Sequence, residues 1–205
     1  MRIIAFVSAA IVALVASALV VQREADKGGS ELPVYWDAPA FELVNQEGDT
    51  VRNGDLAGRV WIASFIFTNC TDICPVISAR LAQVRNALAA DGRLGDDVRL
   101  VSISVDPARD TPAVLLDYSK RFGGSPPAEW AFLTGSPPEA VRALIQEGFK
   151  VTALDPMMDH GMPYQIDHSP RILVIDREGR VRGAHDVNEG DIVERLLSDA
   201  RELAG

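Results

Sequence analysis

The sequence predicts a three-layer α/β domain with a mixed central sheet, preceded by a long apolar segment at the N-terminus. Stretches typical of buried strands alternate with stretches of helical spacing, as expected of parallel strands joined by crossover helices. The alternation ends in a β-hairpin at residues 171–183 and a last helix, so the predicted sheet also contains antiparallel strands. With 205 residues, the chain is long enough for one domain and an appendage.

Two stretches have the apolar, β-branched composition of strands that are buried on both faces. They are residues 59–67 and 98–105. Between them, Pro75–Ala90 carries apolar residues at helical spacing, which predicts a crossover helix. A short hairpin is predicted upstream, where Phe41–Val44 and Thr50–Arg52 flank a turn that contains asparagine and glycine.

Three further helices follow in the sequence, and capping residues mark the first two. Thr111 followed by Pro112 predicts an N-cap and a first-turn proline. Ser136 with Glu139 spells a capping box for the next helix. The last helix is expected to begin near Asn188, where apolar residues return at helical spacing.

The apolar run from Ile3 to Val21 predicts a membrane-spanning helix. At 1.5 Å per residue the run is about 28 Å long, close to the thickness of the hydrocarbon core of a bilayer. The alternative is a cleaved signal peptide, because residues 16–18 form a small-residue cleavage site. The continued apolar run favours the anchor, and Arg2 holds the N-terminus in the cytoplasm so that the rest of the chain lies outside.

The predicted organisation therefore has three parts. Residues 1–21 form the anchor or signal peptide, residues 22–33 a polar tether with two glycines, and residues 34–205 the folded domain. We expect the protein in the bacterial inner membrane, with the soluble domain facing the periplasm or the cell exterior. In that compartment disulfides can form.

Charge and cysteine content exclude two classes of protein. Lys plus Arg number 20 against 29 for Asp plus Glu, which gives a net charge of −9. A nucleic-acid binder needs a dense basic face, which this composition does not supply. With two cysteines in the whole chain, the protein is not a small domain stapled by disulfides.

Cys70 and Cys74 are the candidate reactive residues. They are predicted at the C-terminal end of a central strand and at the start of the following helix, where α/β folds place their sites. The partial positive charge of the helix N-terminus is expected to lower the thiol pKa values. This spacing can bring both sulfurs to one small ion or to each other. The alternative is a pair of inert buried thiols.

Residues 65–75 resemble the C-x-x-x-C-P signature of the Sco/SenC family of thioredoxin-like copper chaperones for cytochrome c oxidase assembly. Residues 104–112 and 164–169 are similar to the same family, and the second stretch contains Asp167 and His168. The resemblance extends from Phe41 to the C-terminus and implies a thioredoxin-like fold. Where many members carry proline between the cysteines, this chain has threonine.

The resemblance implies that Cys70, Cys74 and His168 bind copper, one ion per chain. Two thiolates and an imidazole suit Cu(I), and they also hold Cu(II). The implied role is a metallochaperone rather than an enzyme, and the implied client is the CuA centre of cytochrome c oxidase subunit II. A thiol reductant and another copper chaperone are expected as further partners, because the cysteines must be reduced before they bind a metal.

Supporting roles are predicted for residues around this site. Asp167 is a candidate to orient the imidazole of His168. Asp106 either lines the site or forms a turn, and Asp72, between the cysteines, is expected to be exposed and to tune partner recognition. The irregular loop before His168 holds thioether and imidazole groups that either serve as auxiliary Cu(I) ligands or cover the core: Met157, Met158, His160 and Met162.

A thiol-disulfide oxidoreductase is the alternative function. Cys70 is then the nucleophile and Cys74 the resolving thiol of a redox-active disulfide that reduces cysteines of the oxidase subunit or of other extracytoplasmic proteins. Pro170, which precedes a strand, is expected to follow a cis peptide bond beside the dithiol, as in reducing thioredoxin-like proteins. A thiol peroxidase is a third interpretation, but it leaves the C-x-x-x-C pair unexplained.

Overall fold

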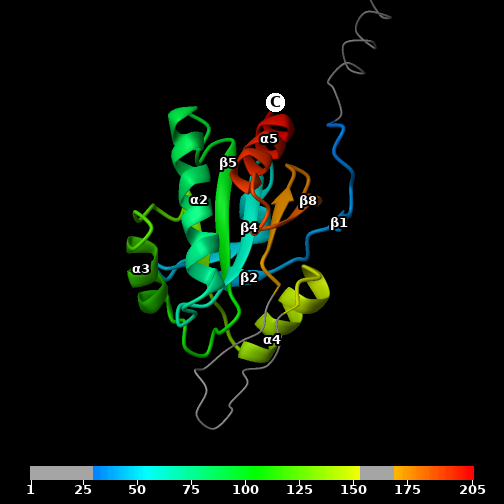
Figure 1. Ribbon diagram of the computed structural model, residues 1–205. Helices are drawn as coiled ribbons and strands as arrows, with labels where there is room; N and C mark the ends of the chain where they lie inside the picture. Colours follow the sequence, from blue (N-terminus) through cyan, green and yellow to red (C-terminus); the bar gives the residue numbers. More distant parts are fainter. Residues whose placement is uncertain (1–29, 153–168) are drawn as a thin grey trace, which may run out of the picture. The chain divides into compact units, whose positions relative to one another are not determined.

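The computed structural model of the protein describes residues 30–152 and 169–205 (Figure 1). The predicted membrane anchor and most of the predicted tether lie outside the described residues, as does the irregular loop before His168. Within the described part of the chain, no helix has the length and apolar character needed to cross a bilayer. One compact unit extends from Leu32 to Gly205.

A six-stranded mixed sheet with the order β1-β8-β7-β4-β5-β6 forms the centre of this unit. Its strands are β1 (Trp36–Asp37), β4 (Val60–Ile66), β5 (Val98–Ser104), β6 (Trp130–Leu133), β7 (Arg171–Ile175) and β8 (Arg180–Asp186). Strands β4, β5 and β6 are parallel, whereas β7 pairs antiparallel with β4, and β8 and β1 continue the antiparallel pairing. The predicted mixed sheet is confirmed, although β1 and β6 were not expected.

A separate hairpin of β2 (Glu42–Val44) and β3 (Thr50–Arg52) confirms the prediction for this segment. Its turn is stabilised by the side chain of Asn45, which accepts hydrogen bonds from the backbone N–H groups of Glu47 at 2.8 Å and Asp49 at 3.0 Å. Gly48 has a φ of +93°, a conformation that side chains disfavour. The turn residues therefore account for the hairpin.

Helices cover both faces of the sheet, so the predicted three layers are present (Figure 1). They are α2 (Ile73–Ala90), α3 (Pro112–Lys120), α4 (Pro138–Ala143) and α5 (Ile192–Ala204), with short helical turns η1 (Asn53–Leu56) and η2 (Leu144–Gly148). Helices α2, α3 and α5 lie on one face. On the other face, Phe149, which follows η2, packs its ring 6.2 Å from that of Trp61 and 5.3 Å from that of Phe65.

Helix starts were predicted with mixed success. The Thr111 side chain caps α3 by accepting a hydrogen bond from the Val114 N–H at 3.4 Å, as predicted. The prediction of a capping box at Ser136 and Glu139 is wrong, because α4 begins at Pro138 and its N-cap residue, Pro137, makes no side-chain cap. The last helix begins at Ile192, later than expected.

Polar side chains inside the sheet fix the position of β6. The hydroxyls of Ser64 on β4 and Ser102 on β5 are 2.8 Å apart, and the Trp130 indole N–H donates to Ser102 at 3.0 Å. Along the outer edge of β6, the Gln46 amide donates to the Trp130 carbonyl at 3.0 Å and accepts from the Phe132 N–H at 2.8 Å. The edge strand is thus covered by the Gln46 side chain and, just past its end, by Val44 of β2, which pairs with Thr134.

Candidate functional site

The two cysteines lie in the connection between β4 and α2, at the edge where the parallel strands end. Cys70 precedes the helix with 7% of its surface exposed, and Cys74 is completely buried in the first turn of α2. Asp72 occupies the N-cap position, is exposed and makes no side-chain cap. The predicted place of both cysteines in the fold is therefore confirmed.

Backbone N–H groups direct both sulfur atoms to the inside of this corner. The Cys74 N–H donates to the Cys70 Sγ at 3.5 Å, and the Phe67 N–H donates to the Cys74 Sγ at 3.5 Å. Both side chains are reduced thiols in this structure. Each sulfur thus accepts a hydrogen bond from a backbone N–H of the same corner. This arrangement suits a dithiol that binds one soft ion or forms a disulfide.

The pKa of the Cys74 thiol is raised well above its ordinary value. The contact with the Cys70 thiol is the largest cause, and burial is the second, while the hydrogen bond from the Phe67 N–H opposes both. The prediction that the helix N-terminus lowers the thiol pKa is therefore wrong for Cys74. The partial charge of a helix end does not offset the loss of water around a completely buried sulfur that contacts a second thiol.

A buried carboxylate beneath the corner was not predicted. Asp110 is 1% exposed and accepts hydrogen bonds from the Thr68 hydroxyl at 2.6 Å, the Thr68 N–H at 3.2 Å and the Ser104 hydroxyl at 2.5 Å. Burial raises the pKa of Asp110 although these hydrogen bonds oppose the shift. Asp110 connects the end of β5 to the loop that carries Cys70. A carboxylate between a buried strand and the helix cap Thr111 is the sequence signal that could have indicated it.

Asp106 is the turn-forming residue after β5. Its backbone carbonyl accepts from the N–H groups of Arg109 at 3.0 Å and Asp110 at 2.9 Å, and its own N–H donates to the Ser104 hydroxyl at 3.0 Å. Its buried carboxylate forms an ion pair with Arg109 at 3.3 Å. Asp106 thus holds the loop at the cysteine edge of the sheet, as the turn interpretation expects.

A hydrogen-bonded serine and tyrosine lie next to the dithiol and were also not predicted. Ser78 comes one helical turn after Cys74 on α2, and its hydroxyl is 2.9 Å from the phenol oxygen of Tyr118 on α3. The pKa of Tyr118 is raised, chiefly by burial, and the nearby Cys74 and Cys70 raise it further. The sequence analysis assigned no role to Ser78 or Tyr118, because no local pattern indicates that the two side chains meet.

The other predicted site residues fall outside the described residues. They are His168, Asp167, Met157, Met158, His160 and Met162. The residues on either side of that segment are hydrogen-bonded, because the Ser169 N–H donates to the Thr152 carbonyl at 2.9 Å. Ser169 precedes β7, whose Ile172 pairs with Ser64 near the end of β4, so Ser169 lies at the cysteine edge of the sheet.

Pro170 follows Ser169 and joins β7 to the end of β8, since its carbonyl accepts from the Val187 N–H at 3.0 Å. Within residues 30–152 and 169–205 the cis peptide bond is Ser136–Pro137, so the expectation of a cis bond before Pro170 is wrong. In the same ranges no three His, Cys, Asp or Glu side chains gather as a metal site. The cysteine pair is therefore the described part of the candidate site.

Known proteins resemble both the sequence and the fold of this chain. A sequence profile of the SCO1/SenC family matches residues 37–204. The SCO1 protein homolog of Bacillus subtilis (strain 168) is 30% identical over 182 residues, which cover 86% of this chain and 89% of that protein. The chain belongs to the SCO1/SenC family. The family resemblance that was inferred from the C-x-x-x-C-P stretch is therefore confirmed, and the match covers residues 37–204.

Solved structures of Sco proteins have the same thioredoxin-like fold. BsSco, described as a member of the Sco family of cytochrome c oxidase assembly proteins with a disulfide switch, matches with a TM-score of 0.72 and 30% identity, over 84% of this chain and 95% of that one. ScoI of Bradyrhizobium japonicum, solved with copper bound, matches with a TM-score of 0.68 and 28% identity, over 82% of this chain and 99% of that one. The mixed sheet and its helices are thus those of a Sco protein.

Proposed function

We propose that this Sco protein is a membrane-tethered copper chaperone that binds one copper ion through Cys70, Cys74 and His168. It delivers the ion to the CuA centre of cytochrome c oxidase subunit II. The observation that carries the proposal is the pair of thiols at one corner, with the Cys74 N–H 3.5 Å from the Cys70 Sγ. A Sco protein with copper bound and a Sco protein of oxidase assembly, both of the same fold, support the cargo and the client.

The chemistry of the donors fits a copper ion. Two thiolates are soft ligands that select Cu(I), and an added imidazole lets the same site hold Cu(II). Ser169, the neighbour of His168 in the chain, lies at the cysteine edge of the sheet, which supports His168 as the third donor. Because the pKa of Cys74 is raised, copper binding must displace a proton from that thiol, and copper affinity should increase with pH.

The test is copper binding by His168→Ala, with His185→Ala as the matched control. His185 is a second histidine, whose Nε2 is 2.7 Å from a carboxylate oxygen of Asp199 on α5. The reduced soluble domain is titrated with Cu(II), and the sulfur-to-copper charge-transfer absorption is recorded. We expect His168→Ala to lose most of the affinity and to change the spectrum, and His185→Ala to retain both.

The opposite result would contradict the chaperone proposal. Unchanged copper affinity and an unchanged spectrum in His168→Ala would exclude His168 as a ligand. If the same variant also lost the ability to reduce a small-molecule disulfide, His168 would instead serve thiol exchange. Circular dichroism of both variants separates a lost ligand from a lost fold.

We further propose that residues 1–21 anchor the protein in the bacterial inner membrane, with the domain in the periplasm or at the cell exterior. The apolar run supports the anchor, and a site of two thiols suits an oxidising compartment if a thiol reductant keeps it reduced. Membranes washed with carbonate should retain the protein. A soluble product whose N-terminus lies near Leu19 would show cleavage and would leave the copper proposal intact.

Thiol-disulfide exchange is the second candidate function, and the arrangement of the two sulfurs favours it. Cys70 retains 7% exposure whereas Cys74 is completely buried, so Cys70 is the attacking sulfur and Cys74 the resolving one. Two electrons pass from the dithiol to a client disulfide, which is reduced to two thiols, while Cys70 and Cys74 form a disulfide that a thiol reductant must reduce again. The disulfide switch described for BsSco supports this chemistry.

A further inference from the structure

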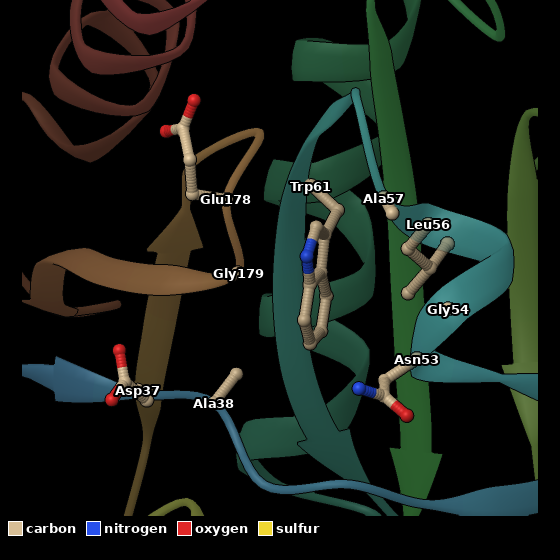
Figure 2. A pocket seen from close by; sticks show the side chains of 9 residues that line it. All are labelled: Asp37, Ala38, Asn53, Gly54, Leu56, Ala57, Trp61, Glu178 and Gly179. Atoms are coloured by element: carbon tan, nitrogen blue, oxygen red, sulfur yellow. The ribbon is translucent and has the colours of Figure 1, made fainter.

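A small pocket lies at the edge of the sheet opposite the cysteines, where β4 begins (Figure 2). The end of β1, the turn η1, the first residues of β4 and the turn between β7 and β8 surround it. Its volume of about 170 Å³ is below the roughly 300–1,000 Å³ of sites for drug-sized ligands. A ligand of this pocket is therefore the size of one aromatic ring with one functional group.

The indole N–H of Trp61 faces this pocket. Trp61 is 2% exposed, and no residue of the described ranges makes a hydrogen bond to its indole N–H. Figure 2 shows the indole nitrogen on the side of the ring that faces Ala38 and Gly179. The nitrogen is not one of the fully enclosed polar atoms without a partner in the described residues, so it keeps contact with the space of the pocket and can donate to an acceptor atom that enters there.

A second donor comes from η1. The Asn53 side-chain oxygen accepts from the Phe41 N–H at 3.4 Å, which fixes the orientation of the amide. The amide nitrogen then points toward the indole of Trp61 (Figure 2). The indole itself is held from behind by the rings of Phe41 and Phe149, at 6.3 Å and 6.2 Å. Both donors are thus preorganised by contacts outside the pocket.

The remaining walls determine the charge and shape of the ligand. Ala38, Leu56 and the face of Trp61 form an apolar surface. The carboxylates of Asp37 and Glu178 stand at the rim, and Glu178 pairs with Arg180 at 2.9 Å. An anion that entered would approach Asp37, a carboxylate with no ion pair among the described residues, so the rim disfavours negative charge.

We infer that the pocket beside Trp61 binds a small uncharged molecule that combines a carbonyl oxygen with a flat apolar body. The carbonyl oxygen accepts from the Trp61 indole N–H and the Asn53 amide, and the apolar body lies against Leu56 and Ala38. This site is separate from the dithiol corner, which lies at the other end of β4. The inference does not depend on the proposed copper chemistry.

Three ligands with one ring in common test the inference: benzamide, which is neutral and has a carbonyl oxygen; benzoate, which is anionic; and benzamidine, which is cationic and has no acceptor. The ¹⁵N-labelled protein has three tryptophans, and Trp61→Phe identifies the Trp61 indole N–H signal. We expect benzamide to move this signal with saturation at a dissociation constant of about 1 mM. Benzoate should bind at least about fivefold more weakly, and benzamidine should give no hydrogen-bond shift.

Internal controls separate specific from general binding. The Trp130 indole already donates to Ser102, so its signal should stay fixed. Asn53→Asp retains an acceptor for Phe41 but removes the donor, and should weaken benzamide binding several-fold. Asp37→Asn should raise the affinity for benzoate toward the affinity for benzamide. A Trp61 signal that benzamide at about 10 mM leaves unmoved, that moves in parallel with Trp130, or that responds equally to all three ligands would overturn the inference.

Discussion

Asp110 and Asp176 are both buried carboxylates, at opposite edges of the same sheet, and their surroundings differ in one respect. Asp176 is 3% exposed and contacts two guanidinium groups, with Arg182 at 2.9 Å and Arg180 at 2.8 Å. Asp110 is 1% exposed and accepts hydrogen bonds from the hydroxyls of Thr68 and Ser104 and from the Thr68 backbone N–H. One carboxylate is neutralised by cations, and the other relies on neutral donors.

The pKa directions follow from this difference. Burial opposes ionisation of Asp176, but the hydrogen bonds from the Arg180 backbone and from both guanidinium groups outweigh it and lower the pKa. Burial raises the pKa of Asp110, and the nearby Asp106 adds to the shift. At the edge without cysteines, the ion pairs of Asp176 therefore stabilise the fold. The cysteine edge keeps a carboxylate that costs free energy when ionised, which is typical of functional sites.

The largest effect is expected from removing Asp176. Asp176→Ala leaves Arg182, which is 7% exposed, without its carboxylate partner, and should lower the free energy of unfolding by about 3 kcal/mol. Urea unfolding followed by circular dichroism measures this loss. Asp37→Ala, which removes an exposed aspartate at the same edge, should change stability by less than about 0.5 kcal/mol. Equal losses in both variants would show that the buried pair adds nothing.

The pH dependence of stability should have opposite signs for the two carboxylates. The raised pKa of Asp110 means that the folded protein keeps a proton that the unfolded chain releases above about pH 4, so this group lowers stability as the pH rises. The lowered pKa of Asp176 means that its contribution is present above about pH 4 and is lost as the pH falls through the folded value.

Two isosteric variants measure these signs. Relative to wild type, Asp110→Asn should gain stability as the pH rises above about 4, whereas Asp176→Asn should lose stability as the pH rises toward about 4 from the acid side. Urea unfolding at each pH gives both differences. If the stability differences of the two variants from wild type changed with pH in the same direction, the contrast between the two edges would be contradicted.

The two thiols should differ in reactivity. Cys74 is completely buried, whereas Cys70 is 7% exposed. Alkylation by iodoacetamide at pH 8 should therefore be at least about tenfold faster in Cys74→Ser, which retains Cys70, than in Cys70→Ser, which retains Cys74. Mass spectrometry of timed samples gives the two rates. Comparable rates would mean that burial does not protect Cys74 in solution.

The smallest effect is expected at the hydrogen bond behind the dithiol. Ser78→Ala and Tyr118→Phe each remove one partner of the 2.9 Å contact and should each cost about 1 kcal/mol. Because both variants break the same bond, the double variant should lose less than the sum of the two single losses. Additive losses in urea unfolding would show that the two hydroxyls do not interact.

The sequence was sufficient to predict the central strands, α2 and the place of the cysteines, because these depend on local apolar patterns. It did not reveal β6, whose four residues are all buried and show no alternation. The Ser136 capping box failed because the chain enters α4 through prolines, which leave Ser136 outside the cap position. Local signals therefore predict the elements that carry a clear apolar pattern or turn signal, such as α2 and the β2–β3 hairpin, and miss β6, which has neither.

The chemistry of the corner was less accessible from the sequence. The Asp110 contact with Thr68 joins residues 42 positions apart, and the contact between Ser78 and Tyr118 joins residues 40 apart. Such pairs follow from the packing of the folded chain and have no local pattern. The thiol pKa was predicted in the wrong direction for Cys74, because a helix start is readable in a sequence and the depth of burial at that start is not.

The chain of hydroxyls and indole that joins Ser64, Ser102 and Trp130 limits how this protein can change by mutation. Replacing Ser102 with an apolar residue leaves an indole and a hydroxyl without partners inside the sheet, which is more costly than replacing all three together. A protein in which a single one of these residues has been replaced is therefore less stable than one in which all three have changed. The three positions should therefore vary as a unit among proteins that share this sheet.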